Sequence, residues 1–148
     1  MLTISITGLK IKMEKIFSRI NKDALLHIVS RRDGITEKRI DLSPEEEFIQ
    51  VSTFKMKEGK TFRAHEHIIQ VKETTKTQES WAVIQGSVKV FYYDLDRTII
   101  CEKILKAGDC SITLHGGHNY LCMEDDTVIY EFKTGPYNGR HKDKEFIN

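Results

Sequence analysis

Turn-forming residues recur at intervals of about ten along the second half of the chain. Gly86, Asp94 to Asp96, Gly108 and Gly116-Gly117 each end a short run rich in β-branched and aromatic residues. Short alternating runs with no helical stretch between them are typical of an antiparallel sandwich or barrel. The sequence therefore predicts an all-β fold with strands over 48–56, 61–68, 80–84, 87–93, 98–105, 111–114, 119–123 and 127–133.

The two ends of the chain differ from this pattern. Residues 14–30 predict a short helix followed by a strand, and Ser43-Pro44-Glu45-Glu46 predicts a helical turn, with Ser43 as N-cap and Glu46 at the capping-box position. The polar, basic C-terminal end predicts a surface tail. We expect an N-terminal arm over 1–46, a barrel over 47–134 and a tail over 135–148, with Met13 as an alternative start.

Composition narrows the choice of partners. The 148 residues carry 23 lysines and arginines against 22 aspartates and glutamates, a net charge of +1. Nucleic acids and acidic membranes bind through clustered excess cations, so neither partner is expected. The chain shows neither the pattern of a secretory signal nor a run of 18 apolar residues, and we expect a cytoplasmic protein.

Histidines in a strand-like segment indicate a metal site. His65 and His67 are two residues apart, so in a strand their rings project from the same face and can reach one ion at about 2.0–2.1 Å. Glu79 and His118 lie at the beginnings of later predicted strands. Three imidazoles and one carboxylate are a recurrent ligand set for Zn, Fe, Mn, Ni or Co.

These residues stand in a familiar pattern. The segment Gly59-(five residues)-His65-x-His67, followed by Glu79-(six residues)-Gly86, resembles the first cupin motif. The segment Gly108-(five residues)-Leu114-x-Gly116-x-His118 is similar to the second cupin motif. The resemblance covers residues 47–133 and implies a double-stranded β-helix, or jelly-roll barrel. It also implies one divalent metal ion inside the barrel, held by His65, His67, Glu79 and His118.

The chain further resembles small cupins associated with surface-polysaccharide and sugar-nucleotide pathways. Three segments carry this likeness: Thr77-Gln78-Glu79, Gly116-Gly117-His118 and Gly135-Pro136-Tyr137-Asn138-Gly139. The substrate this implies is a sugar or a sugar nucleotide. By the same analogy, and because an open edge strand needs covering, we expect a homodimer.

Two departures from the cupin motifs leave the ligand set open. In the usual motif the glutamate follows the second histidine by four or five positions. Here Glu79 follows His67 by twelve positions, so residues 71–78 must loop out. Other candidates for the fourth ligand are therefore Gln70, Glu73 and Gln78. In the second motif the turn is one residue short, which leaves His115 as a rival to His118; a site of three histidines without Glu79 is a further alternative.

Neighbouring side chains are candidates for substrate binding. In regular strands Trp81 shares a face with Glu79, Tyr120 shares one with His118, and Arg63 shares one with His65. Tyr120 can donate to a substrate oxygen, and Arg63 suits an anionic group. The structural alternatives to substrate binding are that Trp81 packs in the core and that Arg63 is a rim residue paired with an acidic neighbour.

The first functional hypothesis is a metal-dependent isomerase or epimerase acting on a small carbohydrate-like or oxygen-rich molecule. The metal would act as a Lewis acid, with His65, His67, His118 and Tyr120 as the catalytic side chains. The alternatives are an Fe(II) dioxygenase, a metal-free isomerase with a histidine base, and a non-catalytic sugar- or metal-binding sensor.

Overall fold

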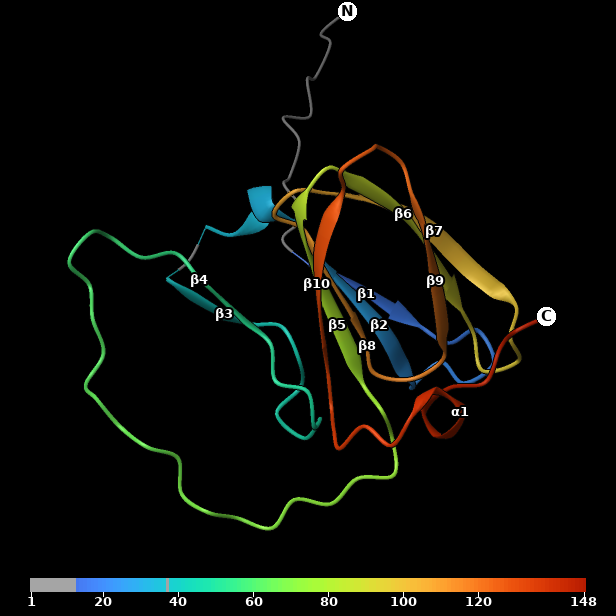
Figure 1. Ribbon diagram of the computed structural model, residues 1–148, viewed down its shortest axis with the longest axis horizontal. Helices are drawn as coiled ribbons and strands as arrows, with labels where there is room; N and C mark the ends of the chain where they lie inside the picture. Colours follow the sequence, from blue (N-terminus) through green and yellow to red (C-terminus); the bar gives the residue numbers. More distant parts are fainter. Residues whose placement is uncertain (1–12, 37) are drawn as a thin grey trace, which may run out of the picture.

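The computed structural model describes residues 13–36 and 38–148, and its structure is dominated by β-strands (Figure 1). This confirms the predicted all-β class. The strands are β1 (Met13–Phe17), β2 (Leu25–Ser30), β3 (Arg39–Asp41), β4 (Ser52–Phe54), β5 (Glu79–Gln85), β6 (Ser87–Tyr93), β7 (Ile99–Lys106), β8 (Cys110–Thr113), β9 (Gly117–Cys122) and β10 (Val128–Lys133). The helices are η1 (Arg32–Gly34), a 3-10 turn, and α1 (Arg140–Asp143). No helix of the described residues is long and apolar enough to cross a membrane.

The strands form three antiparallel sheets. A five-stranded sheet has the order β1-β2-β8-β5-β10, and a three-stranded sheet has the order β7-β6-β9. Strands β3 and β4 pair only with each other. We call the five- and three-stranded sheets together the two-sheet body. Among the described strands neither sheet closes on itself, and β9 and β10 are both edge strands.

The main core lies between the two sheets. On β6, alternate side chains are buried, so the strand period of two divides an inward face from an outward one. Tyr92 is fully buried on that inward face, and its hydroxyl bonds the Ser111 hydroxyl at 2.6 Å. The core cluster consists of Ile16, Val29, Trp81, Val83, Val88, Val90, Tyr92 and Leu105.

A second core lies on the other face of the five-stranded sheet. Ile28, Leu42, Ile49, Ile112 and Leu114 pack together there. β2 is consequently buried on both faces, which explains why its sequence, LLHIVS, is almost continuously apolar rather than alternating.

The segment preceding β4 forms turns instead of the predicted helical turn. Ser43 does not cap a helix; its hydroxyl accepts the Val51 backbone N–H at 3.1 Å, and Gln78 accepts the Ile49 N–H at 2.9 Å. These distant partners satisfy the backbone of the segment in place of helical hydrogen bonds, so the helix prediction is wrong here.

The predicted helix within residues 14–30 is also wrong, because β1 and β2 form a hairpin. Through β2, which pairs with β8, this part of the predicted N-terminal arm joins the sheet. Residues 1–12, including the possible extension before Met13, lie outside the described residues.

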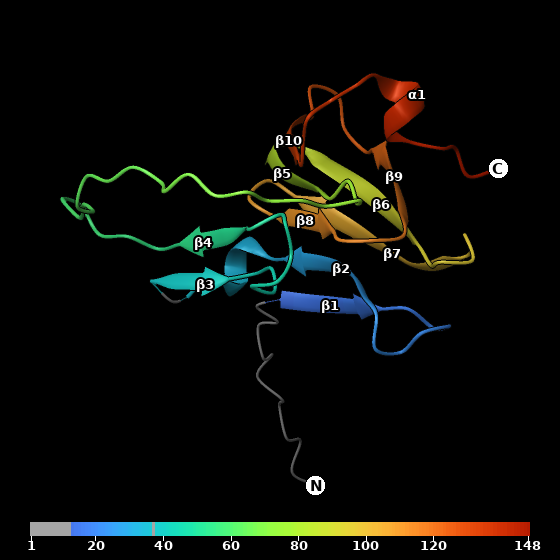
Figure 2. The same cartoon turned by 90° about the horizontal axis from the view of Figure 1, so that it is seen from below.

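From β5 onward the strand predictions are confirmed to within two residues. The predicted strand over 61–68 is wrong, and that over 48–56 shortens to β4. Residues 55–77 contain no strand and are exposed throughout; we call them the long loop. It leaves the body together with the β3–β4 hairpin (Figure 2). Alternation alone does not make a strand, because the backbone groups also need a ladder partner, and the described chain supplies none here.

Candidate functional site

Glu79 and His118 are in direct contact inside the body. The His118 Nε2 atom lies 2.9 Å from the Glu79 Oε1 atom. Glu79 is the first residue of β5 and is buried, and His118 is near the start of β9, in the other sheet. The contact therefore joins an interior strand of the five-stranded sheet to an edge strand of the three-stranded sheet. It brings together two of the four predicted metal ligands, 39 residues apart in the chain.

Two aromatic side chains complete this cluster. Trp81 donates its indole N–H to the same Glu79 oxygen at 2.7 Å. The rings of His118 and Tyr120 pack edge-on against the indole, with centroids 5.3 and 4.8 Å away. Trp81 thus belongs to the core, as its structural alternative proposed, and also orients the carboxylate.

The charge states of the cluster follow from these contacts. Burial acts to raise the pKa of Glu79, but the hydrogen bond and charge of His118, together with the Trp81 N–H, lower the pKa below its usual value. Burial and the negative charges of Glu131 and Glu79 raise the pKa of Tyr120. At neutral pH the site therefore combines an ionised carboxylate with a protonated phenol.

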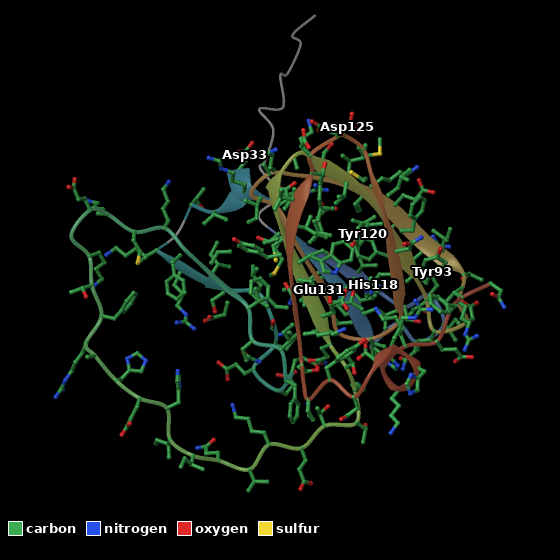
Figure 3. All side chains as sticks on the ribbon, viewed as in Figure 1. Asp33, Tyr93, His118, Tyr120, Asp125 and Glu131 are labelled. Carbon is green, nitrogen blue, oxygen red and sulfur yellow. The ribbon has the colours of Figure 1, made fainter. Side chains whose placement is uncertain are left out.

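The cluster opens into a pocket of about 630 Å³ between β9 and β10. Figure 3 shows His118 and Tyr120 of β9 and Glu131 of β10 lying between these two strands. Four carboxylates and one lysine are among the lining residues, so the wall of the pocket is acidic. The lining consists of Thr77, Glu79, Tyr93, Thr113, Gly116, Gly117, His118, Asn119, Tyr120, Glu131, Asp143, Lys144, Glu145, Phe146 and Ile147.

The C-terminal tail contributes residues that the sequence did not indicate. Residues 143–147 line the pocket, and ion pairs between Asp143 and Lys133 (3.0 Å) and between Glu145 and Arg97 (2.8 Å) hold the tail to the body. The basic character of the tail indicated only solvent exposure. The sequence also did not identify Glu131 as a pocket residue. Glu131 lies opposite Trp81 in the β5–β10 pairing, and this pairing is known only from the structure.

The other predicted ligands do not reach this pocket within one chain. His65 and His67 lie on the exposed long loop, with ring centroids 5.4 Å apart, and Arg63 lies there too. Gln70 and Glu73 are also exposed on the long loop, whereas the buried Gln78 contacts Glu47 and the Ile49 backbone. His115, the rival of His118, is exposed outside the cluster.

The residues of one chain fit the predicted metal ion only in part. Glu79 and His118 are suitable ligands, and their 2.9 Å separation suits either a hydrogen bond or two ligands of one ion at about 2.0–2.2 Å. The His118 Nδ1 atom is buried and has no hydrogen-bond partner among the described residues. However, the described residues contain no group of three or more His, Cys, Asp or Glu side chains positioned to hold a metal.

Comparison of the chain with protein-family models, curated proteins and solved structures found no match.

Proposed function

We propose that the chain is a small cupin-type enzyme that isomerises or epimerises a carbohydrate-like molecule at the Glu79–His118 pair. The observation that carries this proposal is the convergence of an ionised carboxylate, an imidazole and a protonated phenol on one acidic pocket. Carboxylates and the neighbouring Asn119 are suitable partners for the hydroxyl groups of a sugar.

The chemistry needs one base and one acid. His118 and Trp81 occupy the Oε1 atom of Glu79, and among the described residues nothing bonds Oε2. Oε2 is therefore available to remove a proton from the carbon next to a substrate carbonyl, while the Tyr120 hydroxyl donates to the carbonyl oxygen. In an isomerase, protonated Glu79 returns this proton to the former carbonyl carbon of the enediol, and the neighbouring hydroxyl gives its proton back to Tyr120 as the new carbonyl forms. In an epimerase, water protonates the opposite face of the same carbon, Glu79 releases its proton to solvent, and the enediol hydroxyl returns its proton to Tyr120.

The cupin assignment is supported by the backbone conformation of the motif glycines. Gly86, which ends the first motif, has φ +75°, and Gly116 in the second motif has φ +81°. This left-handed region favours glycine, so both turns need the residue that the motif provides. The motif glycines therefore have a structural role in the two turns that they occupy.

A metal-binding form of the same site is a second candidate. The observation in its favour is the contact between Glu79 and His118, the two downstream residues of the predicted ligand set. A divalent ion bound there would polarise a carbonyl or hydroxyl oxygen. Elemental analysis of the purified protein tests this candidate. It is supported if the wild type contains about one metal ion per chain and if His118→Ala lowers this metal content at least tenfold.

The proposed reaction is tested by deuterium incorporation. Glucose, mannose, xylose and fructose, each with and without a phosphate group, are incubated with the protein in D2O, and the C–H signals next to the carbonyl are followed by NMR. We expect exchange with at least one of these sugars. Glu79→Gln should slow it by about 100-fold or more, and Tyr120→Phe by about 10- to 100-fold, since each removes one proton-transfer group.

Tyr130→Phe is the matched control, because Tyr130 is an exposed tyrosine on the same strand as Glu131 and outside the pocket lining. It should leave the exchange rate unchanged. Wild-type protein that exchanges none of these sugars, or a Glu79→Gln variant as fast as wild type, would refute the reaction.

A further inference from the structure

Within the part of the chain that the structure describes, the outer edges of β9 and β10 and the long loop have no pairing strand. The strands β9 and β10 are edge strands on either side of the pocket, and they leave large apolar side chains exposed, among them Leu121, Tyr130 and Phe132 at 55–59%. On the long loop, Ile68, Ile69 and Val71 are 84%, 100% and 89% exposed. Unpaired strand edges and exposed large apolar side chains both favour association.

The pattern of the long loop suits a strand. In an extended conformation His65, His67, Ile69 and Val71 project from one face, and the alternate residues project from the other. One face therefore combines two imidazoles with two large aliphatic side chains, as a strand does when it lines a partly polar pocket. The loop needs only a neighbouring edge to form this strand.

The charges of the two surfaces are opposite. The long loop carries six lysines and arginines against three glutamates, a net charge of +3. The pocket wall carries four carboxylates against one lysine, a net charge of −3. Opposite potentials of this kind steer association and select the partner.

The loop does not fold back over its own pocket. The β3–β4 hairpin is anchored at its base, where Leu42 and Ile49 are buried in the second core. Beyond the hairpin, Phe62 packs edge-on against Phe54 at 5.9 Å, so the first part of the loop continues outward with β4. Figures 1 and 2 both show the loop projecting from the body.

We propose that two copies of this chain exchange their long loops, so that residues 61–71 of one copy pair with the open edges of β9 and β10 in the other. Each pocket then contains Glu79 and His118 from one chain, and His65 and His67 from its partner. A reciprocal exchange of this kind forms a closed two-fold dimer. The inference goes beyond the proposed reaction and does not depend on it.

A cross-linking experiment distinguishes exchange from folding within one chain. Protein labelled with ¹⁵N is mixed with unlabelled protein, unfolded in urea and refolded together, and a carbodiimide then couples lysines to carboxylates in contact. We expect cross-links from Lys60 or Lys72 of the loop to Glu131, Asp143 or Glu145 of the pocket. Mass spectrometry should find about half of these peptide pairs mixed in isotope, since random pairing makes half of the dimers mixed.

Only mixed-isotope pairs support the exchange. If these cross-links join peptides of the same isotope alone, the loop closes its own pocket, and if none form, the loop does not dock; either result overturns the proposal. Neither result bears on proton transfer by Glu79, which the deuterium assay measures separately.

Mass in solution provides a second test. Light scattering should give a dimer for the wild-type chain, and I69D/V71D should shift it to a folded monomer with an unchanged far-UV spectrum. The matched control T74D/T75D adds the same charge to the loop outside the paired stretch and should remain a dimer. A monomeric wild type, or an I69D/V71D protein that stays dimeric, would contradict the proposal.

Discussion

The long loop and the two-sheet body have similar local patterns but different structures. Both contain alternating apolar residues and motif glycines, yet residues 87–93 form β6 between two neighbouring strands, whereas residues 61–68 form no strand. On β6, alternation places Val88, Val90 and Tyr92 in the core. Alternation indicates which side chains share a face, and only a hydrogen-bonded neighbour makes the segment a strand.

The largest difference in the free energy of unfolding is expected between apolar side chains truncated in the body and those truncated in the long loop. Leu105→Ala should lower the free energy of unfolding by about 2–5 kcal/mol, because Leu105 is fully buried between the sheets. Ile69→Ala, measured at a concentration where the chain is monomeric, should change it by less than about 0.5 kcal/mol, since Ile69 is fully exposed. Urea unfolding followed by tryptophan fluorescence measures both. An Ile69→Ala cost close to that of Leu105→Ala would show that the loop is packed within its own chain.

Two glycines with the same backbone conformation sharpen the comparison. Gly86 and Gly59 both have φ +75°, but an added Cβ at Gly86 would lie 2.3 Å from the Thr127 hydroxyl, whereas nothing lies within 4 Å at Gly59. Gly86→Ala should cost about 2–3 kcal/mol, from the left-handed conformation plus the clash. Gly59→Ala should cost less than about 1 kcal/mol, because the exposed turn can relax. Thermal unfolding of both variants checks this difference, and equal costs would contradict it.

Acid sensitivity should come from a histidine of the body. Burial lowers the pKa of His27 to about 4, and its ring bonds Thr113 and the Tyr93 carbonyl, each at 3.1 Å. Because the unfolded chain binds this proton near pH 6.5, the contribution of neutral His27 is complete above that pH and is lost as pH falls toward 4. The loss is about 1.4 kcal/mol per pH unit, or about 2 kcal/mol between pH 6.5 and 5.

Urea midpoints at pH 7 and pH 5 test this acid dependence. His27→Gln should be less stable at pH 7 but should show a flatter dependence on pH than the wild type. His65→Gln on the long loop is the control, because that side chain is exposed in the single chain; measured where the chain is monomeric, it should retain the wild-type slope. An unchanged slope in His27→Gln would assign the acid sensitivity to other groups.

Local patterns determined much of the body and half of the site. From β5 onward, turn residues and the period of two located each strand to within two residues, because both signals act between near neighbours in sequence. The same signals placed Glu79 and His118 at the beginnings of strands. The spacing of the second motif left His115 as a rival, but His118 begins the predicted strand after Gly116-Gly117, and the structure places His118 beside Glu79.

Contacts between distant residues were decided only by the tertiary structure. The turns over 43–51 depend on Gln78, and the pocket depends on Glu131 and on a tail held by ion pairs. The long loop forms no strand because none of the described strand edges pairs with it. These outcomes depend on which segments meet in space. A pattern of neighbouring residues shows what each segment is suited to form, and the free energy of packing and pairing between distant segments decides whether it forms.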